Sequence, residues 1–409
     1  MRILICYPWL KLGGAPKTAI TLAKGLKERG HEIYFFTKKG GMYEDLLKKA
    51  SIPIIPAPYH PFLPQMFHLN HRAYRILKKT IRDYSIDIVH SFHPLPYFLS
   101  LFAVTPEDIP AIYTVVGPQD RWPYPAYPGR VIFVAKEFRD KSEKHVGRYS
   151  RERIVLPNRV DLDRFSSEVD WSDFARKKGL PEKGWKIAFM SRLDHTKEKS
   201  VYYSMEAVES LLNKGRNVIL AIAGDGTHAE KLMQHADTIN SKRSKQVIKF
   251  IGPIEQTPEF LSWADIVLGI GRCAFEGMAT SKPTLIVGEK GLAGVVEDVK
   301  TEELQYYNFA GRNITEQQDI SLLANAIEEI LTNKEKYRDL AEFSREYVKK
   351  NYGYREGARK LEQIYEKSLS EMPLTGYEKT RTLITAFLNG YCRRAYKAAR
   401  TELVNLIRR

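Results

Sequence analysis

Residues 186–226 read KIAFMSRLDHTKEKSVYYSMEAVESLLNKGRNVILAIAGDG, and this stretch decides the fold class. Residues 186–191 and 218–223 are apolar runs of strand length, whereas residues 200–214 have the apolar spacing of a helix. A strand, a helix and a second strand in this order are typical of a βαβ unit, whose strands are parallel. The stretch therefore predicts an α/β fold with helices on both faces of a parallel sheet.

The same alternation extends over most of the chain. Short apolar runs bounded by turn residues predict strands at residues 3–7, 31–37, 86–91, 111–116, 131–135, 247–251, 266–268 and 284–287. Helical spacing is found at residues 18–29, 319–331 and 333–350. Gly30 is placed to end the first of these helices, and Asp319 and Asn333 are good N-cap residues for the other two.

The length of 409 residues indicates two domains, at roughly 100–200 residues each. A polar stretch over residues 163–185 has the composition of an interdomain connection. We therefore expect two Rossmann-like, doubly wound domains that face each other across a cleft. Their expected ranges are 1–165 for the first domain and 166–350 for the second. A helix that crosses back to the first domain is expected at 351–369, and a basic amphipathic tail at 370–409.

Composition narrows the class of protein. Hydrophobic residues make up 43% and charged residues 28%, which excludes a disordered or disulfide-stapled chain. Three cysteines are too few for a disulfide framework or a four-cysteine zinc site, so a reducing, cytoplasmic compartment fits best. The first residues resemble no signal peptide, and the apolar stretch 96–105 is shorter than the ~20 residues of a membrane-spanning helix.

The charge is strongly basic, with 64 Lys and Arg against 49 Asp and Glu and a net charge of +15. Such an excess attracts polyanions, anionic lipid headgroups or phosphorylated substrates. From Glu371 to Arg409 there are eight basic and three acidic residues, and apolar residues recur at helical intervals over 376–409. This pattern predicts a helix that lies on an anionic membrane surface, or a helix whose apolar face packs on the protein itself.

A glycine pair, Gly13-Gly14, follows the first predicted strand and opens a helix. Glycine allows a ligand to approach the backbone, and a helix N-terminus favours anionic groups. The spacing is not that of the G-x-G-x-x-G dinucleotide fingerprint, so it does not favour nicotinamide or flavin binding. The alternative is a tight turn that binds no ligand.

Cations and glycines follow two strands of the second half. Arg192 and Lys197 come after the strand 186–191, where open α/β sheets bind ligands, and together they could neutralise a diphosphate. The alternative is a solvated basic turn. Glu276 follows a glycine turn, Gly269-Ile270-Gly271, on the first turns of a short helix. A carboxylate that faces the cleft there could accept both ribose hydroxyls, or it could simply complement the helix dipole.

In combination these motifs are much more specific than any one alone. In chain order they are Gly13-Gly14, Gly30-His31-Glu32, Asp87-Ile88-Val89-His90, Pro157-Asn158-Arg159-Val160-Asp161 with Phe165, Ser191-Arg192-Leu193 with Lys197, Gly224-Asp225-Gly226 and Phe275-Glu276-Gly277-Met278-Ala279. This order resembles glycosyltransferase family 4, the retaining nucleotide-sugar transferases of GT-B fold. The resemblance covers about residues 1–369.

The resemblance implies that the second domain, 166–350, is the nucleotide-sugar donor domain and that the first, 1–165, is the acceptor-side domain. By matching positions, Arg192 and Lys197 would hold the donor diphosphate, Glu276 the ribose, and Gly13 and Gly14 the sugar and phosphates. The remaining glycines of the implied donor site are Gly224, Gly269 and Gly271. Neutralising the departing diphosphate is itself catalytic, because negative charge builds on it as the glycosidic bond breaks.

The family needs no metal ion and no cofactor besides the nucleotide sugar. Asp161-Leu162-Asp163 matches the D-x-D metal motif of another glycosyltransferase fold, but it lies inside the signature that joins the two domains, so we interpret it as structural. Nucleic acid is not an expected partner, because no helix-turn-helix, zinc-finger or RNP-type motif accompanies the basic charge.

The sequence departs from the family pattern at several positions. Counting back from Glu276 places Leu268 where the first of two paired glutamates is usual, Val116 stands where a histidine is usual, and Arg159 replaces a glycine. Either Arg272 supplies charge in place of the missing carboxylate, or the chain is a degenerate family member that binds without transfer. Further polar candidates on the acceptor side are His93, Asp120 and Arg121.

The resemblance implies a retaining, hexosyl-type glycosyltransferase of the EC 2.4 class. It would move a sugar from a nucleotide-sugar donor to a glycan or lipid-linked acceptor, in the synthesis of cell-surface polysaccharide or glycolipid. We expect a cytoplasmic protein, peripheral at the inner face of the cell membrane. The alternative is a sugar-nucleotide-binding or glycan-binding protein of the same fold that catalyses no reaction.

Overall fold

The computed structural model describes residues 1–11, 13–59, 70–117, 129–143 and 150–388. Two of the acceptor-side candidates, Asp120 and Arg121, and the tail from residue 389 onward lie outside the described residues. The chain forms two compact α/β units: Met1–Pro157 together with the chain from Arg355 onward, and Asn158–Tyr354. The boundary lies before the predicted one at 165/166, because Val160 and Phe165 are buried in the core of the second unit.

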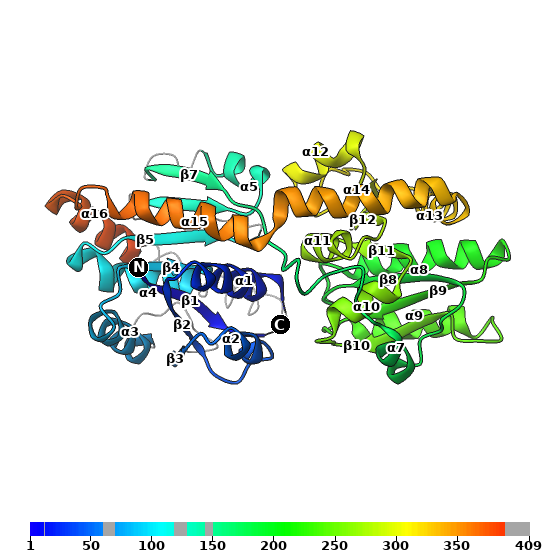
Figure 1. The fold of residues 1–409 in the computed structure, drawn as a ribbon, viewed down its shortest axis with the longest axis horizontal. Coiled ribbons are helices and arrows are strands. Elements are labelled where there is room, and N and C mark those ends of the chain that lie inside the picture. Colours follow the sequence, from blue (N-terminus) through cyan, green and yellow to red (C-terminus); the bar gives the residue numbers. More distant parts are fainter. Residues whose placement is uncertain (12, 60–69, 118–128, 144–149, 389–409) are drawn as a thin grey trace, which may run out of the picture. The chain divides into compact units, whose positions relative to one another are not determined.

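Unit 1 contains a seven-stranded parallel sheet in the order β3-β2-β1-β4-β5-β6-β7 (Figure 1). The strands are β1 Arg2–Trp9, β2 Glu32–Lys38, β3 Ile54–Pro56, β4 Ile88–Ser91, β5 Ala111–Val115, β6 Arg130–Phe133 and β7 Glu152–Val155. β3 and β7, which the sequence did not predict, form the two edges. Alternate residues of β1 enter two separate cores, Ile3 and Ile5 on one face and Leu4 and Cys6 on the other. The predicted doubly wound architecture of this unit is therefore confirmed.

The helices of unit 1 cover both faces of this sheet. They are α1 Gly14–Glu28, α2 Glu44–Lys49, α3 His71–Asp83, α4 Pro94–Val104 with the 3₁₀ turn Thr105–Glu107, α5 Lys136–Lys141, α15 Tyr354–Leu369 and α16 Gly376–Phe387. α1 begins four residues before the predicted start at Thr18, at Gly14. Pro16 fits inside its first turn, because the first N–H groups of a helix have no partner within it.

Unit 2 contains a six-stranded sheet in the order β10-β9-β8-β11-β12-β13, in which only β13 is antiparallel to its neighbour. The strands are β8 Trp185–Met190, β9 Val218–Ala223, β10 Ile248–Gly252, β11 Ile266–Gly269, β12 Thr284–Gly288 and β13 Gly291–Val295. The helices are α7 Ser172–Lys178, α8 Glu198–Asn213, α9 Ala229–Asn240, α10 Thr257–Trp263, α11 Arg272–Ala279, α12 Asp298–Tyr306, α13 Ile320–Thr332 and α14 Lys334–Tyr352.

The predicted connection over residues 163–185 is wrong. It lies within unit 2 and contains α7, whose Phe174 and Ala175 are buried in the core, and Trp185 already begins β8. By contrast, the predicted N-caps are confirmed. The Asp319 side chain accepts a hydrogen bond from the backbone N–H of Ser321, and Asn333 accepts one from that of Lys336.

In each sheet the first strand lies near the centre, and the chain builds outward from it in one direction and then in the other. The direction reverses between β1 and β4 in unit 1 and between β8 and β11 in unit 2. Open parallel sheets bind ligands beyond the carboxyl ends of the strands at such a reversal. The residues that follow β8 and β11, and those that follow β1 and β4, are therefore the candidates for the site.

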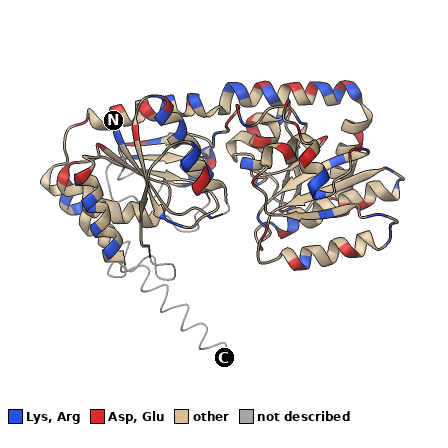
Figure 2. Cartoon of the chain, turned by 60° about the horizontal axis from the view of Figure 1, so that its bottom comes forward, with Lys and Arg blue, Asp and Glu red and all other residues tan. Residues whose placement is uncertain are grey.

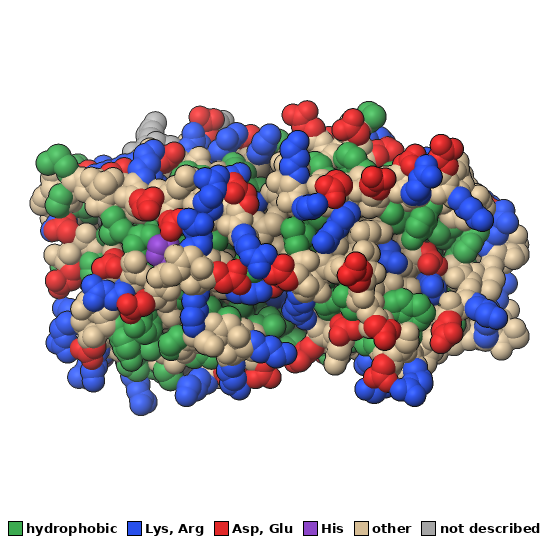
Figure 3. Space-filling view, in the orientation of Figure 1, with side chains coloured by type: hydrophobic (Ala, Val, Ile, Leu, Met, Phe, Trp, Pro, Cys, Tyr) green, Lys and Arg blue, Asp and Glu red, His purple; other side chains and the backbone are tan. Residues whose placement is uncertain are grey.

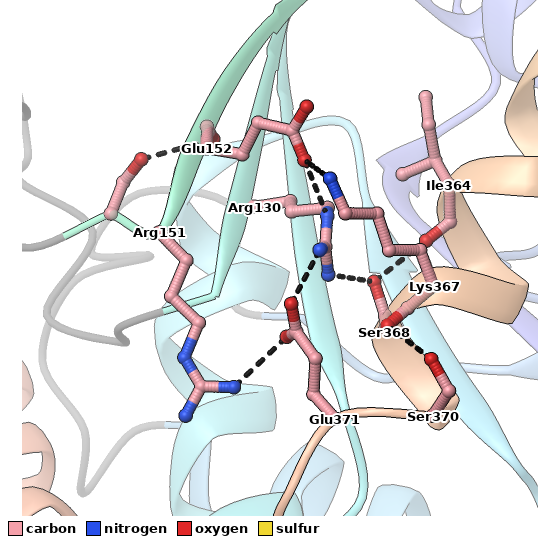
Figure 4. A network of polar contacts seen from close by, with 9 residues as sticks. Arg130, Arg151, Glu152, Ile364, Lys367, Ser368, Ser370 and Glu371 are labelled. Atoms are coloured by element: carbon pink, nitrogen blue, oxygen red, sulfur yellow. Dashed lines mark hydrogen bonds and ion pairs between the residues drawn. The ribbon is translucent and has the colours of Figure 1, made fainter.

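The chain after unit 2 belongs to unit 1. The predicted returning helix 351–369 corresponds to α15, which buries Ala358, Leu361 and Tyr365 in the same core as α1. At its end Arg130, which is 3% exposed, forms ion pairs with Glu152 and Glu371 and donates a hydrogen bond to Ser368 (Figure 4). This network fastens the end of α15 to strands β6 and β7.

The described part of the predicted tail is the helix α16, which packs on unit 1. A capping box of Thr375 and Glu378 starts it, Lys379 forms a 2.6 Å ion pair with Asp108, and Thr382 and Ala386 are buried. The opposite face is exposed and apolar, and consists of Tyr377, Ile384, Phe387 and the adjoining Leu388. Among the described residues, no helix has the length and apolar character needed to span a membrane.

Figure 2 shows Lys and Arg on helices of both units, and on the face drawn in Figure 3 basic and acidic side chains are interspersed. Within unit 1 the helix α3 differs from this mixture. It carries Arg72, Arg75, Lys78, Lys79 and Arg82 against one acidic residue, Asp83. The basic excess of the sequence is thus locally high on this one helix.

Candidate functional site

The loop after β8 is held against the loop after β9. Ser191 donates its backbone N–H to Ala223, and Leu193 donates to Asp225, at 3.1 and 3.0 Å. A Cβ atom on Gly224 would lie 1.8 Å from the carbonyl oxygen of Ser191. Gly224 is therefore required for the close approach of the two loops, and it shapes the site through the position of Arg192.

Two cations, Arg192 and Lys197, lie on this loop at the reversal of the unit 2 sheet. Arg192 is 56% exposed at its side chain and forms a 3.1 Å ion pair with Asp194. Lys197 occupies the N-cap position of α8. Burial lowers the pKa of Lys197, and the positive charge of Arg192 lowers it further. Because like charges held together are unfavourable, an anionic ligand would stabilise this arrangement.

The connection from β11 to α11 is only Ile270-Gly271. Gly271 has φ of 56°, a left-handed conformation that favours glycine, and it is the N-cap residue of α11. A Cβ on Gly269 would lie 2.8 Å from the Sγ atom of Cys273. Both glycines therefore let the helix start directly at the end of the strand, beside the loop that carries Arg192.

Glu276, which the sequence analysis expects to face the cleft, lies buried on α11. Its side chain is 1% exposed and accepts a 2.8 Å hydrogen bond from Nε of Arg272, whose side chain is 11% exposed. Arg272 also donates from Nη1 to the carbonyl oxygen of Arg159 at 3.0 Å. One carboxylate oxygen of Glu276 therefore holds the guanidinium of Arg272 in place.

The departures from the family pattern have structural explanations. Leu268 lies within β11, fully buried between β8 and β12. A charged glutamate would have no solvent there, so Leu268 acts as a core residue of β11. The side chain of Arg159 is buried and donates a hydrogen bond from Nη1 to the carbonyl oxygen of Asn351. Val116 follows the end of β5 and is half-buried.

Unit 1 brings a second group of candidates to its own reversal. Gly13 precedes α1 and donates its backbone N–H to the Tyr43 hydroxyl at 3.3 Å, and Gly14 is the first residue of α1. His93 is the N-cap of α4, and its ring lies 5.5 Å from that of Trp9 at the end of β1. Nδ1 of His93 accepts from the backbone N–H of Leu95, so a neutral ring carries its proton on Nε2. His93 is thus arranged to donate a hydrogen bond.

The two aspartates of the D-x-D pattern take part in local structure. Asp161 accepts hydrogen bonds from the backbone N–H groups of Asp163 and Arg164, and Asp163 accepts one from the Tyr354 hydroxyl. Over the described residues, no three or more His, Cys, Asp or Glu side chains are grouped so that they could hold a metal ion.

Sequence reasoning missed one part of this site, the loop at residues 307–313. Arg312 on this loop is close enough to Lys197 for its positive charge to lower the pKa of that lysine. The sequence contains no motif that links these two residues, because they lie far apart in the chain and meet only through the fold. Glu289, in the turn between β12 and β13, also acts on Lys197, in the opposite direction.

Comparison with known proteins gives two family matches. Residues 12–164 match the family model described as Glycosyltransferase Family 4, and residues 172–347 match the model described as Glycosyl transferases group 1. The first match lies within unit 1 apart from its last residues, and the second lies within unit 2.

Two curated proteins illustrate the relationship. The chain is 24% identical over 303 residues to the putative glycosyltransferase EpsD of Bacillus subtilis, covering 67% of this chain and 76% of that protein. It is 22% identical over 333 residues to the alpha-monoglucosyldiacylglycerol synthase of Streptococcus pneumoniae, covering 72% and 73%.

Solved structures agree in fold. A glycosyltransferase from Rickettsia africae ESF-5 superposes with a TM-score of 0.69 at 20% identity, covering 91% of this chain and 99% of that one. Alr3699/HepE of Anabaena, in complex with UDP and glucose, has a TM-score of 0.68 at 16% identity, covering 90% and 99%. The GT-B fold expected from the resemblance is thereby confirmed.

Proposed function

The chain belongs to the GT-B glycosyltransferases of the family 4 type and acts on a nucleotide-sugar donor, and from this premise we propose a more specific reaction. It transfers a hexosyl residue, with retention of configuration, to a glycan or a lipid-linked acceptor. The product belongs to a cell-surface polysaccharide or glycolipid. The name of the pneumococcal relative, a monoglucosyldiacylglycerol synthase, supports a lipid-linked acceptor.

The observation that carries this proposal is the pair of cations at the reversal of the unit 2 sheet. Arg192 and Lys197 are held close together by loops whose geometry depends on Gly224. As the bond to the sugar breaks, negative charge develops on the departing diphosphate. Fixed cations at that place stabilise the transition state more than the ground state, which is the requirement for catalysis.

We propose a positioning role for Glu276. Its side chain is 1% exposed and its Oε1 atom accepts a hydrogen bond from Arg272, which favours this role over direct contact with a ribose. In the observed arrangement Glu276 orients Arg272, whose guanidinium lies on the first turn of α11 beside Gly271. Arg272 can thus contribute positive charge near the donor in place of the first glutamate of the family pattern.

No metal ion takes part in the proposed reaction, because Arg192, Lys197 and the start of α11 supply the positive charge. Transfer measured in excess EDTA is therefore expected to equal transfer in its absence. If activity is lost in EDTA and returns with Mn²⁺ or Mg²⁺, the diphosphate is neutralised by a metal and this part of the proposal is wrong.

The second candidate function is a donor-binding protein that catalyses no transfer. Val116 favours it, since a hydrophobic side chain stands where the family usually places a histidine. A thermal-shift screen over nucleotide sugars identifies the donor, because a ligand at 100 times its Kd stabilises by about 2.7 kcal/mol. Release of nucleoside diphosphate with an acceptor extract, and the anomeric configuration of the product by NMR, then distinguish retaining transfer, inverting transfer and binding alone.

Unit 1 is the proposed place of attachment to an anionic membrane at the inner face of the cell, where a lipid-linked acceptor would be found. α16 presents the exposed apolar residues Tyr377, Ile384, Phe387 and Leu388. A groove of about 960 Å³ runs between α3 and residues 103–109 and is lined by the basic residues of α3. An apolar surface near basic residues has the chemistry that binds anionic lipid.

A further inference from the structure

The loop after α12 in unit 2 has an unusual backbone. Asn308 and Phe309 are consecutive non-glycine residues with φ of 54° and 52°, and Gly311 has φ of 67°. A left-handed conformation at a bulky residue costs free energy and persists only where surrounding contacts impose it. The contacts here are extensive, because Phe309 is fully buried and its ring packs on Phe275 of α11 at 5.2 Å.

The 307–313 loop contacts two elements of unit 2, the start of α11 and the end of β12. On one side the carbonyl oxygen of Phe309 accepts the backbone N–H of Gly271, the N-cap of α11, at 2.6 Å. On the other side Gly311 packs backbone to backbone on Gly288 at the end of β12, where a Cβ on Gly311 would lie 2.5 Å from the Cα of Gly288. The loop is therefore held between the N-terminus of α11 and the C-terminal end of β12 in unit 2.

This placement puts Arg312 at the carboxyl ends of the unit 2 strands, where the cations of the β8 loop also lie. The turn after Gly288 reaches α8, since Glu289 forms a 3.4 Å ion pair with Lys199, two residues beyond Lys197. Nη2 of Arg312 donates to the carbonyl oxygen of Tyr307 at 3.1 Å, which restrains the guanidinium on its own loop. The positive charges of Arg192 and Arg312 both act on Lys197, and Asp194 and Glu289 oppose them.

We infer that Arg312 is a third phosphate-binding residue, which holds the donor diphosphate together with Arg192 and Lys197. The inference rests on the proposed function and extends it to a loop that no motif identifies. A diphosphate presents several oxygens in a spread geometry, and a guanidinium can bind two of them at once. In a reaction without a metal ion, cations from separate loops surround the departing diphosphate. The 307–313 loop contributes Arg312 from the end of β12.

Binding of inorganic pyrophosphate, measured by calorimetry at two salt concentrations, tests the inference without knowledge of the sugar or base. We expect Arg312→Gln to raise the Kd at least tenfold and to weaken its dependence on salt. Arg312→Lys should retain part of the affinity, because it keeps the charge and loses the fork. The matched control is Lys300→Gln, which removes an exposed positive charge from α12 and should leave the Kd unchanged.

The melting temperatures of the same variants without ligand separate binding from loop support. If Arg312→Gln and Arg312→Lys lose affinity equally and both melt at lower temperature, Arg312 only supports the loop and the inference is wrong. It is also wrong if Arg192→Ala weakens pyrophosphate binding and Arg312→Gln binds as the wild type does. If the wild type binds neither pyrophosphate nor any nucleotide sugar, the proposed function itself fails.

Discussion

Lys197 shows how a single side chain can be prepared for an anionic ligand. It is half-buried at the start of α8, and both burial and the positive charge of the Arg192 guanidinium lower its pKa. A bound phosphate favours the charged form of Lys197, because it adds negative charge beside these cations. The favourable interaction between the phosphate and these cations contributes to the affinity for the donor.

At this scale we predict that Arg192→Ala and Lys197→Ala each weaken donor binding and slow transfer by more than tenfold. Each removes a charge-assisted hydrogen bond worth about 1.5–3 kcal/mol. The control is Lys199→Ala, an exposed cation on the same turn that is paired with Glu289. Equal losses in all three variants, measured by steady-state kinetics, would mean that only the general basic charge of the turn matters.

The buried pair of Arg272 and Glu276 leads to a second prediction. Arg272→Ala leaves a carboxylate that is 1% exposed without its guanidinium, so the variant should lose about 3–5 kcal/mol of unfolding free energy. The double variant Arg272→Ala with Glu276→Gln should recover part of this loss, because no charge then remains buried. Urea denaturation of both variants measures the difference. If the single variant is as stable as the wild type, Glu276 does not depend on Arg272 and a direct ribose contact becomes the better interpretation.

At the scale of elements, α15 returns to unit 1 and is held there by a buried core and a polar network (Figure 4). The pKa of Glu152 is lowered chiefly by the hydrogen bond from Lys367 and further by Arg130. Burial alone would raise the pKa of Glu371, but hydrogen bonds from Arg130 and Arg151 lower it overall. Both carboxylates therefore favour the folded state in their charged form.

This network predicts a loss of stability in acid. The stabilisation is complete above the unfolded pKa of a glutamate, near 4.5, and disappears as pH falls through the lower pKa values of the folded state. Glu371→Gln should cost about 1–3 kcal/mol at pH 7, because buried Arg130 loses a charged partner, and the cost should shrink toward pH 3. Chemical denaturation of wild type and variant between pH 7 and pH 3 measures it; a cost that is constant with pH would contradict the assignment.

At the scale of the whole molecule, membrane attachment is the property with the clearest test. Truncation after Leu369 is not suitable, because α16 buries Thr382 and Ala386 against unit 1 and its loss would expose that core. We instead predict that Ile384→Glu with Phe387→Glu strongly reduces co-sedimentation with vesicles containing phosphatidylglycerol. Both side chains are exposed, so the fold should be retained.

A control for this experiment replaces an exposed residue of similar size elsewhere, Leu322→Glu on α13 of unit 2. It should leave vesicle binding unchanged. If the α16 variant still binds as tightly as the wild type, α16 is not the attachment surface. Binding that then falls after Arg75→Glu and Lys78→Glu would assign the surface to α3 instead.

The sequence by itself determined the parallel α/β architecture, most strands and the N-caps at Asp319 and Asn333, because alternating burial and capping depend on residues close together in the chain. It also indicated Arg192 and Lys197, since the carboxyl end of a parallel strand is a local feature. The edge strands β3, β7 and β13 escaped prediction because none is a continuous apolar run: β3 ends in Pro56, β7 begins with Glu152 and Arg153, and β13 contains two glycines. Residues 163–185 were misassigned because their few buried residues lie among polar ones.

Only the tertiary structure decided the remaining features of the site. Glu276 is buried and bound by Arg272, which also donates to the backbone of Arg159, a residue distant in sequence. Leu268 is a core position because β8 and β12 pair on either side of it. The loop that carries Arg312 reaches the end of β12 because Gly288 and Gly311 pack without side chains. Each depends on contacts between segments that the sequence separates, and neither periodicity nor composition encodes which segments will meet.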